Sequence, residues 1–265
     1  MQYRASSSLQ WETPLREWDP PLRNEKGLTQ LQWISALRSS GVLLWSFEYW
    51  SQLCLREFAP ELVLARPAYR IIRKPRLRPP HVLCVLGPVG SGKTLATAVL
   101  KRDFGYEEIN TGRVVAELLG IPPVPTTPRA EFQARAWAFI SQPNGPKRLA
   151  RRLTDLVGAS SSDRILVDGV RQGATINLLR QDCSGHRVGL LFVHTPADLA
   201  YRFYAKRVAQ GASIADFLAA RSALVENEVQ ALIGEADAVL YNWTGTLEYR
   251  NTIRQMMSEL GIRGR

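Results

Sequence analysis

The length and composition of the chain exclude several classes of protein. With 265 residues, of which 45% are hydrophobic, it has enough apolar side chains for a packed core, which excludes general disorder. No apolar run reaches the roughly 20 residues that a membrane-spanning helix needs, and three scattered cysteines favour neither disulfides nor zinc. We therefore expect a cytoplasmic protein without membrane contact, whose net charge of +10 favours polyanionic partners such as nucleotides or nucleic acids.

Residues 1–66 are predicted to form a mainly helical extension that is rich in tryptophan. Apolar residues in its second half recur at helical spacing, as Leu31, Ile34 and Leu37 do. Of the seven tryptophans in the chain, the extension holds Trp11, Trp18, Trp33, Trp45 and Trp50. They indicate either a small core of its own or a surface that docks on the rest of the protein.

Residues 67–80 are predicted to be a basic linker, because they contain four prolines and no carboxylate. Its positive charges are Arg70, Arg73, Lys74, Arg76 and Arg78. Two interpretations remain open for this segment. It is either a solvated tether or a nucleic-acid site, in which the charges hold the backbone while Tyr69 and nearby tryptophans stack on bases.

From residue 81 to residue 265, short apolar runs alternate with longer helical patterns. The expected strands are residues 81–86, 106–109, 164–168, 187–193 and 236–241. The expected helices lie at about 93–103, 111–120, 129–157 with a break near Pro143, 173–182, 196–233 with a break near Gly211, and 245–260. This alternation predicts an α/β domain in three layers, α/β/α, around a parallel sheet of five strands.

The strongest chemical signal directly follows the first expected strand. The segment fits the pattern G-x-x-x-x-G-K-[ST] and reads Gly87, Pro88, Val89, Gly90, Ser91, Gly92, Lys93 and Thr94. Its glycines permit the backbone N–H groups to turn inward around phosphate oxygens at the start of a helix. Lys93 is then expected to reach the β- and γ-phosphates, and the Thr94 hydroxyl to ligate Mg²⁺. The loop therefore predicts binding of ATP together with Mg²⁺.

A carboxylate lies at the end of another expected strand. Asp168 closes residues 164–168 and is followed by Gly169 and Arg171. Because neighbouring parallel strands end at the same edge of a sheet, we expect Asp168 to face Thr94 and the metal. The alternative is that Asp168 only caps the turn that follows it.

The order of these motifs resembles that of the P-loop kinases, in the branch of the nucleoside monophosphate kinases and dephospho-CoA kinases. The resemblance covers about residues 81–260. Besides the phosphate loop, it is carried by INTGRVVAELL at 109–119, NGPKRLARRL at 144–153, LVDGVR at 166–171, YRFYAKR at 201–207 and ADAVLYNWTGTLE at 236–248. It implies a P-loop NTPase fold and a phosphotransferase that uses ATP and Mg²⁺.

The resemblance also implies catalytic roles for particular residues. Lys93 and Asp168 would act at the phosphates and the metal. Arg171 would grip the phosphate of an acceptor, while Arg202 and Arg207 would neutralise charge on the group in transfer. Arginine suits such contacts because its planar fork binds phosphate oxygens in pairs.

Further residues are implied in binding of the acceptor and the base. Thr111 and Gly112 resemble a segment that lines the acceptor pocket, although a helix N-cap explains Thr111 equally well. Arg148 and Arg151 are additional acceptor candidates on an expected helix. Asn242 either lies beside the adenine or ends a strand.

The chain departs from the dephospho-CoA kinases after the second expected strand. Those kinases carry an acidic residue there, whereas this chain has Asn110. A phosphate acceptor needs no strong base, since its transfer depends on positioning and charge stabilisation. We therefore expect a mononucleotide acceptor, with the proline-rich residues 121–128 as an acceptor-side loop. The alternative is a nucleotide-dependent regulatory or nucleic-acid-binding module, including a kinase of polynucleotide ends, that uses the basic N-terminal part.

Overall fold

The computed structural model describes residues 26–29, 32–33, 35–36, 68–73, 81–124, 126–183, 185–195, 197–206, 213–226, 228–242 and 246–264. Most of the predicted helical extension and residues 74–80 of the predicted linker lie outside these residues. Within the extension, the Trp33 N–H donates to the Thr29 carbonyl at 2.9 Å, as in a helical turn. The chain divides into two units, Met1–Pro67 with Pro196–Arg202 and Ala68–Thr195 with Phe203–Arg265.

A mostly parallel sheet forms the centre of the second unit. Its strands in chain order are β1 (Tyr69–Ile71), β2 (His81–Leu86), β3 (Glu107–Asn110), β4 (Arg164–Asp168), β5 (Arg187–His194) and β6 (Ala238–Tyr241). In space they follow the order β1-β6-β5-β2-β4-β3, and β2 to β6 are parallel. The predicted α/β fold is therefore confirmed.

The sheet has one strand more than the sequence predicted, because β1 pairs antiparallel with β6 at its edge. This strand comes from the segment that was predicted to be a linker. The Tyr69 hydroxyl donates to the Glu259 carboxylate at 2.6 Å, a bond that with burial raises the pKa of Tyr69 to about 12. Arg73 forms an ion pair with Asp237 at 3.3 Å. Such a strand is hard to predict, since short, charged sequences are typical of sheet edges.

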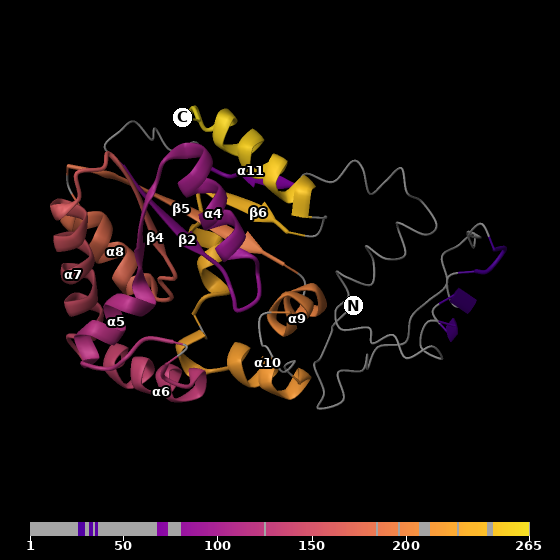
Figure 1. Ribbon diagram of the computed structural model, residues 1–265, viewed down its shortest axis with the longest axis horizontal. Coiled ribbons are helices and arrows are strands. Elements are labelled where there is room, and N and C mark those ends of the chain that lie inside the picture. The colour runs from indigo at the N-terminus through magenta and orange to yellow at the C-terminus, as the bar shows by residue number, and fades with distance from the viewer. Residues whose placement is uncertain are drawn as a thin grey trace. The chain divides into compact units, whose positions relative to one another are not determined.

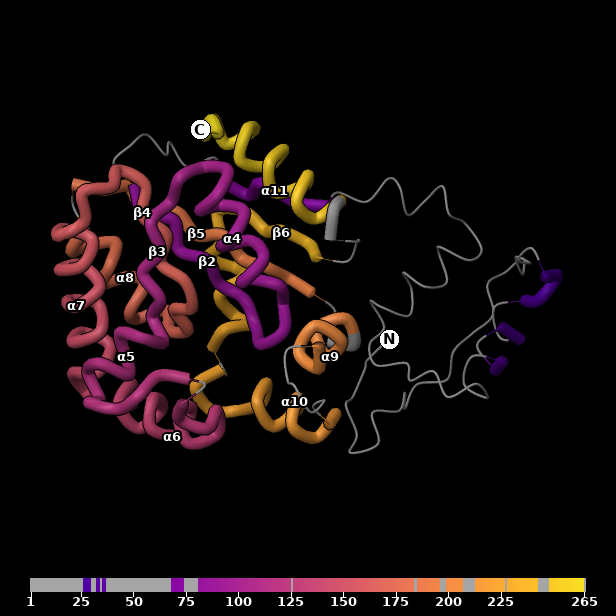
Figure 2. Tube along the Cα trace, viewed as in Figure 1, coloured from indigo at the N-terminus to yellow at the C-terminus, as the bar shows by residue number. Residues whose placement is uncertain are grey.

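Helices cover both faces of the sheet (Figures 1 and 2). The helices of the described residues are α4 (Lys93–Phe104), α5 (Thr111–Leu119), α6 (Arg129–Ile140), α7 (Gly145–Ala159), α8 (Gly173–Asp182), α9 (Ala197–Ala205), α10 (Ile214–Arg221) and α11 (Thr246–Glu259), with short 3₁₀ helices η1 (Leu224–Glu226) and η2 (Ala231–Glu235). The faces of the sheet are covered by α7 and α8 on one side and by α4 and α11 on the other. The predicted break near Pro143 is confirmed, because α6 ends at Ile140 and α7 begins at Gly145.

Strand β2 shows why the sheet is buried on both faces. Its residues are all buried and almost all apolar, as expected of a central parallel strand. Val82 and Cys84 face a core cluster shared with α7 and α8, whereas Leu83 and Val85 face a second cluster shared with α4 and α11. The expected three-layer arrangement is therefore present.

No helix within the described part of the chain is both long and apolar enough to cross a bilayer.

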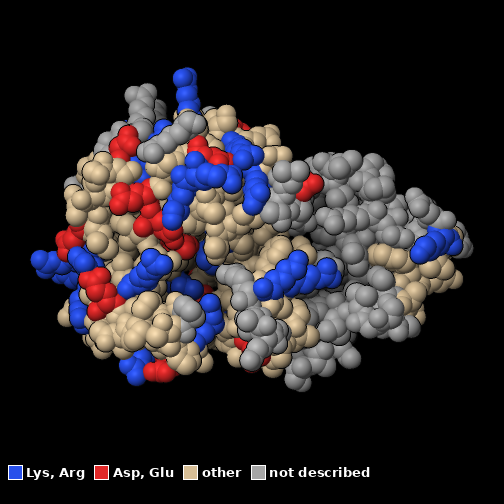
Figure 3. Space-filling model, viewed as in Figure 1, with Lys and Arg blue, Asp and Glu red and all other residues tan. Residues whose placement is uncertain are grey.

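Figure 3 shows acidic side chains beside many of the basic ones on the face that it presents. Several form close pairs, such as Lys101 with Glu108 at 2.7 Å and Arg254 with Asp103 at 2.8 Å. Part of the positive charge on the described surface is thus balanced by neighbouring carboxylates.

Candidate functional site

The glycine-rich loop between β2 and α4 has the backbone that phosphate binding requires. Gly87, Gly90 and Gly92 have φ angles of 140°, 79° and 95°, which side-chain-bearing residues rarely adopt. A Cβ at Gly87 would collide with the Val193 carbonyl oxygen, and one at Gly92 would collide with the Asn242 amide. The loop therefore needs glycine both for its conformation and for its close packing.

Two buried side chains hold this loop from behind. The Thr195 hydroxyl donates to the Ser91 carbonyl at 2.6 Å, and the Asn242 amide donates to the same oxygen at 3.0 Å. Thr195 is 1% exposed and Asn242 is 4% exposed. The structure thus places Asn242 under the loop as a support, and its predicted contact with a base stays a prediction. Thr195 follows β5 without a motif of its own, so its support of the loop was not predictable from the sequence.

Lys93 is the first residue of α4, and its side chain curls over the loop. Its Nζ donates to the Gly87 carbonyl at 2.6 Å and to the Pro88 carbonyl at 2.9 Å. The ammonium therefore lies where the loop is concave. Because α4 also directs the N–H groups of its first turn towards this place, the local field favours an anion.

Asp168 lies at the carboxyl end of β4, beside the strand that leads into the loop. It pairs with Val85 of β2, and the Asn110 amide makes a long contact of 3.5 Å with its Oδ2. Asp168 and Thr94 line the same cleft, as the parallel topology predicted. Within the described ranges, no three His, Cys, Asp or Glu residues form a metal cluster. Mg²⁺ does not need one, because it commonly binds one or two protein oxygens plus substrate phosphates.

The cleft in front of the loop has a volume of about 560 Å³. Besides the loop and Asp168, its lining includes Val124, Thr127, Arg129, Arg171 and Tyr204. Val124 and Thr127 belong to the proline-rich residues 121–128, which were expected to face an acceptor. Neither Arg129 nor Tyr204 was predicted as a site residue: Arg129 belongs to no recognisable motif, and in YRFYAKR at 201–207 only the arginines were given a role.

Arg171 reaches this cleft with its orientation set by buried groups. Its Nε is 2.7 Å from Oε1 of Glu226, whose side chain is only 2% exposed, whereas that of Arg171 is 26% exposed. Its Nη1 donates to the Gly169 carbonyl at 3.1 Å. The Gln133 amide donates to the same Glu226 oxygen at 3.3 Å and to the Ala220 carbonyl at 2.9 Å. This network links α6, α10 and η1 to the loop after β4.

The structure does not bring the other predicted acceptor residues to the cleft. Thr111 is 4% exposed within α5, and Gly112 follows it in the same helix. Arg151 is exposed on α7, and the Arg148 guanidinium lies 5.1 Å from the centre of the Phe139 ring. The geometry therefore gives these residues no support as acceptor ligands. Thr111 is buried by packing of α5, and both arginines are exposed on α7, as charged residues of a surface helix commonly are.

Asn110, rather than Thr111, caps helix α5. The Asn110 Oδ1 accepts the Arg113 backbone N–H at 3.1 Å, and its backbone is extended, as expected of an N-cap. The basic residue Arg152 in α7 pairs with Glu117 in α5 at 2.7 Å. These contacts fasten α5 and α7 to one another and to the sheet.

One of the two predicted arginines of the lid segment lies among the described residues. Arg202 is an exposed residue of α9 and belongs to the unit of Met1–Pro67 and Pro196–Arg202. Arg207 lies outside the described residues. Their roles in charge neutralisation stay predictions.

The predicted nucleic-acid segment at residues 70–78 is described only in its first part. Arg70 is exposed. Arg73, by contrast, binds Asp237 and donates to the Glu235 carbonyl at 2.5 Å, so it fastens β1 to the sheet. Arg73 is therefore already engaged within the protein. Binding of nucleic acid by the remaining basic residues of this segment stays a prediction.

Comparisons with known proteins found similar proteins among solved structures only. No family model matches the chain, and no curated protein matches it in sequence. Among solved structures, a gluconokinase from Sinorhizobium meliloti 1021 is 15% identical, with a TM-score of 0.43, over 69% of this chain and 94% of that one. A sugar kinase from Janibacter sp. HTCC2649 is 18% identical, with a TM-score of 0.43, over 69% of this chain and 95% of that one.

A shikimate kinase from Acinetobacter baumannii, in complex with shikimate, is 16% identical, with a TM-score of 0.45, over 68% of this chain and 92% of that one. All three are similar in structure and are small-molecule kinases by name. Likenesses with TM-scores below 0.5 do not identify an activity. The sheet order and the glycine loop themselves define the chain as an α/β protein of the P-loop type.

Proposed function

We propose that this protein is a phosphotransferase that moves the γ-phosphoryl group of ATP to a small acceptor carrying a phosphate, such as a nucleoside monophosphate. One observation carries the proposal: a single cleft is lined by the phosphate loop, Asp168 and an arginine, Arg171, that is held by a buried carboxylate. A loop that only bound a nucleotide would not require such an arginine opposite it.

The residues of the loop fit the triphosphate of ATP. Their N–H groups and the start of α4 supply an anion site, and Lys93 adds a positive charge for the β- and γ-phosphates. The Thr94 hydroxyl and the Asp168 carboxylate are the oxygen donors that would hold Mg²⁺. Mg²⁺ bound there would neutralise charge on the phosphate oxygens.

In the proposed reaction, an oxygen of the acceptor phosphate attacks the γ-phosphorus of ATP. A new P–O bond forms while the bond between the γ-phosphorus and the bridging oxygen breaks, and ADP leaves with that oxygen. The acceptor phosphate is already ionised at neutral pH, so no base has to remove a proton. The protein contributes by alignment and by positive charge, which Lys93 and Arg171 supply.

The carboxylates of the cleft favour a phosphate acceptor over a hydroxyl acceptor. Among the described residues that line the cleft, Asp168 is the one carboxylate, and Mg²⁺ binding would occupy it. Asn110, at the end of β3, uses its side-chain oxygen to cap α5. Arg129 and Arg171 instead offer two guanidinium groups to an anionic acceptor.

The direct test is incubation with ATP, Mg²⁺ and a panel of ribo- and deoxynucleoside monophosphates and dephospho-CoA. Phosphorus NMR and ADP release would follow the products. We expect one or more nucleoside monophosphates to become diphosphates, with matching ADP. Hydrolysis of ATP with no transfer to any member of the panel would contradict the proposal.

A further inference from the structure

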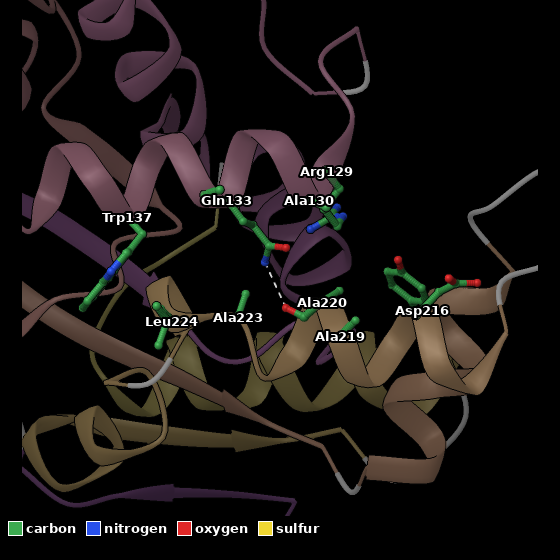
Figure 4. A pocket seen from close by; sticks show the side chains of 11 residues that line it. Arg129, Ala130, Gln133, Trp137, Asp216, Ala219, Ala220, Ala223 and Leu224 are labelled. Atoms are coloured by element: carbon green, nitrogen blue, oxygen red, sulfur yellow. Dashed lines mark hydrogen bonds between the residues drawn. The ribbon is translucent and has the colours of Figure 1, made fainter. Parts of the chain in front are cut away.

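A second cavity lies beside the cleft, between α6 and the segment that contains α10 and η1 (Figure 4). We call it the α6–α10 groove, and its volume is about 520 Å³. On α6 it is lined by Arg129, Gln133 and Trp137, which follow one another at intervals of four residues and so share one helix face. Figure 4 shows these side chains directed from α6 towards α10.

The opposite wall of the groove consists mainly of small residues. Ala219, Ala220 and Ala223 line it, with Leu224 beyond them. Ala220 is buried, whereas Leu224 is 55% exposed. Small side chains facing the Trp137 indole leave a space with an aromatic surface on one side and methyl groups on the other.

The polar groups of the groove are largely engaged with the protein itself. The Gln133 amide nitrogen donates to the Ala220 carbonyl and to Glu226. The Asp216 carboxylate accepts from the Ser213 N–H at 3.0 Å and from the Ser213 hydroxyl at 2.7 Å, closing a capping box at the start of α10. The hydrogen bond to Ser213 also keeps the pKa of Asp216 below its ordinary value. Most of the groove surface is therefore apolar.

Arg129 and Tyr204 line both the groove and the cleft. The Arg129 guanidinium lies 5.9 Å from the centre of the Tyr204 ring, a cation–π arrangement that keeps the charge at the junction. A single molecule can therefore place an anionic group beside Arg129 in the cleft and its remaining part in the groove.

We infer that the α6–α10 groove binds part of the body of the phosphoryl acceptor, and that this part is a flat ring rather than a sugar or polyol. The identification of the ligand as the acceptor rests on the proposed phosphotransfer, whereas the chemistry of the groove does not. A flat ring gains contact with Trp137 and with the alanine wall. A sugar or polyol gains less from this lining, because hydroxyl groups that lie against apolar surface find no hydrogen-bond partner there.

Two simple phosphate monoesters test this inference without any catalytic step. Phenyl phosphate has a flat apolar body, and glucose 6-phosphate has a polyhydroxylated body, with the same phosphate on each. Both are titrated calorimetrically into the full chain in the presence of Mg²⁺ and a non-hydrolysable ATP analogue, which keeps them out of the phosphate loop. We expect phenyl phosphate to bind at least about tenfold more tightly. Equal affinity, or tighter binding of glucose 6-phosphate, overturns the inference.

Matched substitutions test whether the groove is the place of binding. Ala134 on α6 and Ala219 on α10 are exposed and line the groove, whereas Ala138 and Ala215 are exposed on the same helices and do not line it. We expect Ala134→Phe and Ala219→Phe to weaken phenyl phosphate by at least about tenfold. Ala138→Phe and Ala215→Phe carry the same helix-propensity penalty and are expected to leave its affinity within about twofold. If Ala134→Phe weakens binding no more than Ala138→Phe does, and Ala219→Phe no more than Ala215→Phe does, the ligand does not bind in the groove.

The outcomes separate this inference from the proposed function. If phenyl phosphate binds in the groove but no nucleotide is ever phosphorylated, the phosphotransfer proposal fails and the groove assignment stands. If nucleotides are phosphorylated but neither Ala134→Phe nor Ala219→Phe raises the acceptor KM, the groove assignment fails alone. Binding of the ATP analogue by each variant confirms that it is folded.

Discussion

Arg171 and Glu226 form an ion pair of 2.7 Å between the loop after β4 and the 3₁₀ helix η1. The carboxylate is almost fully buried, so the pair defines where the Arg171 guanidinium can point. Gln133 donates to the same carboxylate from α6. An arginine that must align a phosphate benefits from such support, because less of its freedom is lost when a ligand binds.

We predict that Glu226→Gln raises the acceptor KM by about tenfold and leaves the ATP KM unchanged, because Arg171 loses its orientation but the phosphate loop is intact. The free energy of unfolding is expected to fall by about 2 kcal/mol, a value reduced for the partial exposure of Arg171. Steady-state kinetics and urea unfolding measure both effects.

The control for this substitution is Glu117→Gln, which removes an exposed arginine–glutamate pair with Arg152. We expect it to change the free energy of unfolding by about 0.5 kcal/mol or less and to leave both KM values unchanged. Equal kinetic effects of the two substitutions would show that Glu226 has no special role in positioning Arg171.

We predict that Lys93→Ala lowers phosphotransfer by about a thousandfold, since it removes a charge directed at the transferred phosphate. The melting temperature is expected to change little, because water from the cleft can replace the Lys93 ammonium at the two loop carbonyls to which it donates. Lys101→Ala, on the same helix and paired with Glu108, is the matched control with expected normal activity. Normal turnover by Lys93→Ala would refute the assignment of the loop.

Gly92→Ala is predicted to lower both ATP binding and the free energy of unfolding much more than Gly120→Ala does. Both glycines have positive φ angles, 95° and 64°, and each substitution pays the strain of that conformation, about 1–2 kcal/mol. A Cβ at Gly92 would also collide with Asn242, whereas a Cβ at Gly120 meets nothing within 4 Å. We therefore expect Gly92→Ala to lose ATP binding and at least about 1 kcal/mol more stability.

Thermal unfolding and binding of an ATP analogue measure these effects. Combining Gly92→Ala with Asn242→Ala removes the collision and is expected to recover part of the lost stability. If Gly92→Ala and Gly120→Ala behave alike, then packing against Asn242 does not shape the loop.

The pH dependence of stability is predicted to include a contribution from His81. This residue is 1% exposed, and its ring lies 2.7 Å from the Tyr106 hydroxyl. Burial, with nearby Arg164, lowers the pKa of His81 from 6.5 to about 4. As pH falls, the unfolded chain binds this proton before the folded protein does. The contribution is therefore complete above about pH 6.5 and is lost between about pH 6.5 and 4, by at most about 3 kcal/mol.

Urea unfolding at pH 7 and pH 4.5 tests this effect. The loss of stability between the two values is expected to be smaller in His81→Phe, which cannot take up the proton. Tyr106→Phe removes the hydroxyl partner but retains the histidine, so it is expected to keep the wild-type pH dependence. An unchanged pH dependence in His81→Phe would contradict the prediction.

Local patterns were enough to predict the five parallel strands, the position of the glycine-rich loop and the place of Asp168 beside it. The run HVLCVL is buried on both faces of the sheet, and such burial requires continuous apolar sequence. The loop conformation needs glycine at fixed spacing, so the pattern itself carries the structure. The position of Asp168 near Thr94 was predictable because the carboxyl ends of neighbouring parallel strands lie at the same edge of the sheet.

Other features depend on partners that are distant in sequence. Residues Tyr69–Ile71 were predicted to be part of a linker. They form the strand β1 through their pairing with β6, which the local sequence does not reveal. Arg148 and Arg151 were acceptor candidates or simply exposed residues in the sequence; in the structure they are exposed on α7 and do not line the cleft, and their role stays a prediction. Direction and pairing arise from packing, which a motif does not contain.

The sequence by itself determined the P-loop architecture and the position of the phosphate loop, since both depend on backbone conformations and apolar periodicities encoded within short segments. Tertiary structure alone decided that Glu226 holds Arg171, that Asn242 and Thr195 support the loop, and that α6 and α10 enclose a groove. The physical reason is that these contacts join segments whose closeness is set by the folded core, and their free energy exists only once that core has formed.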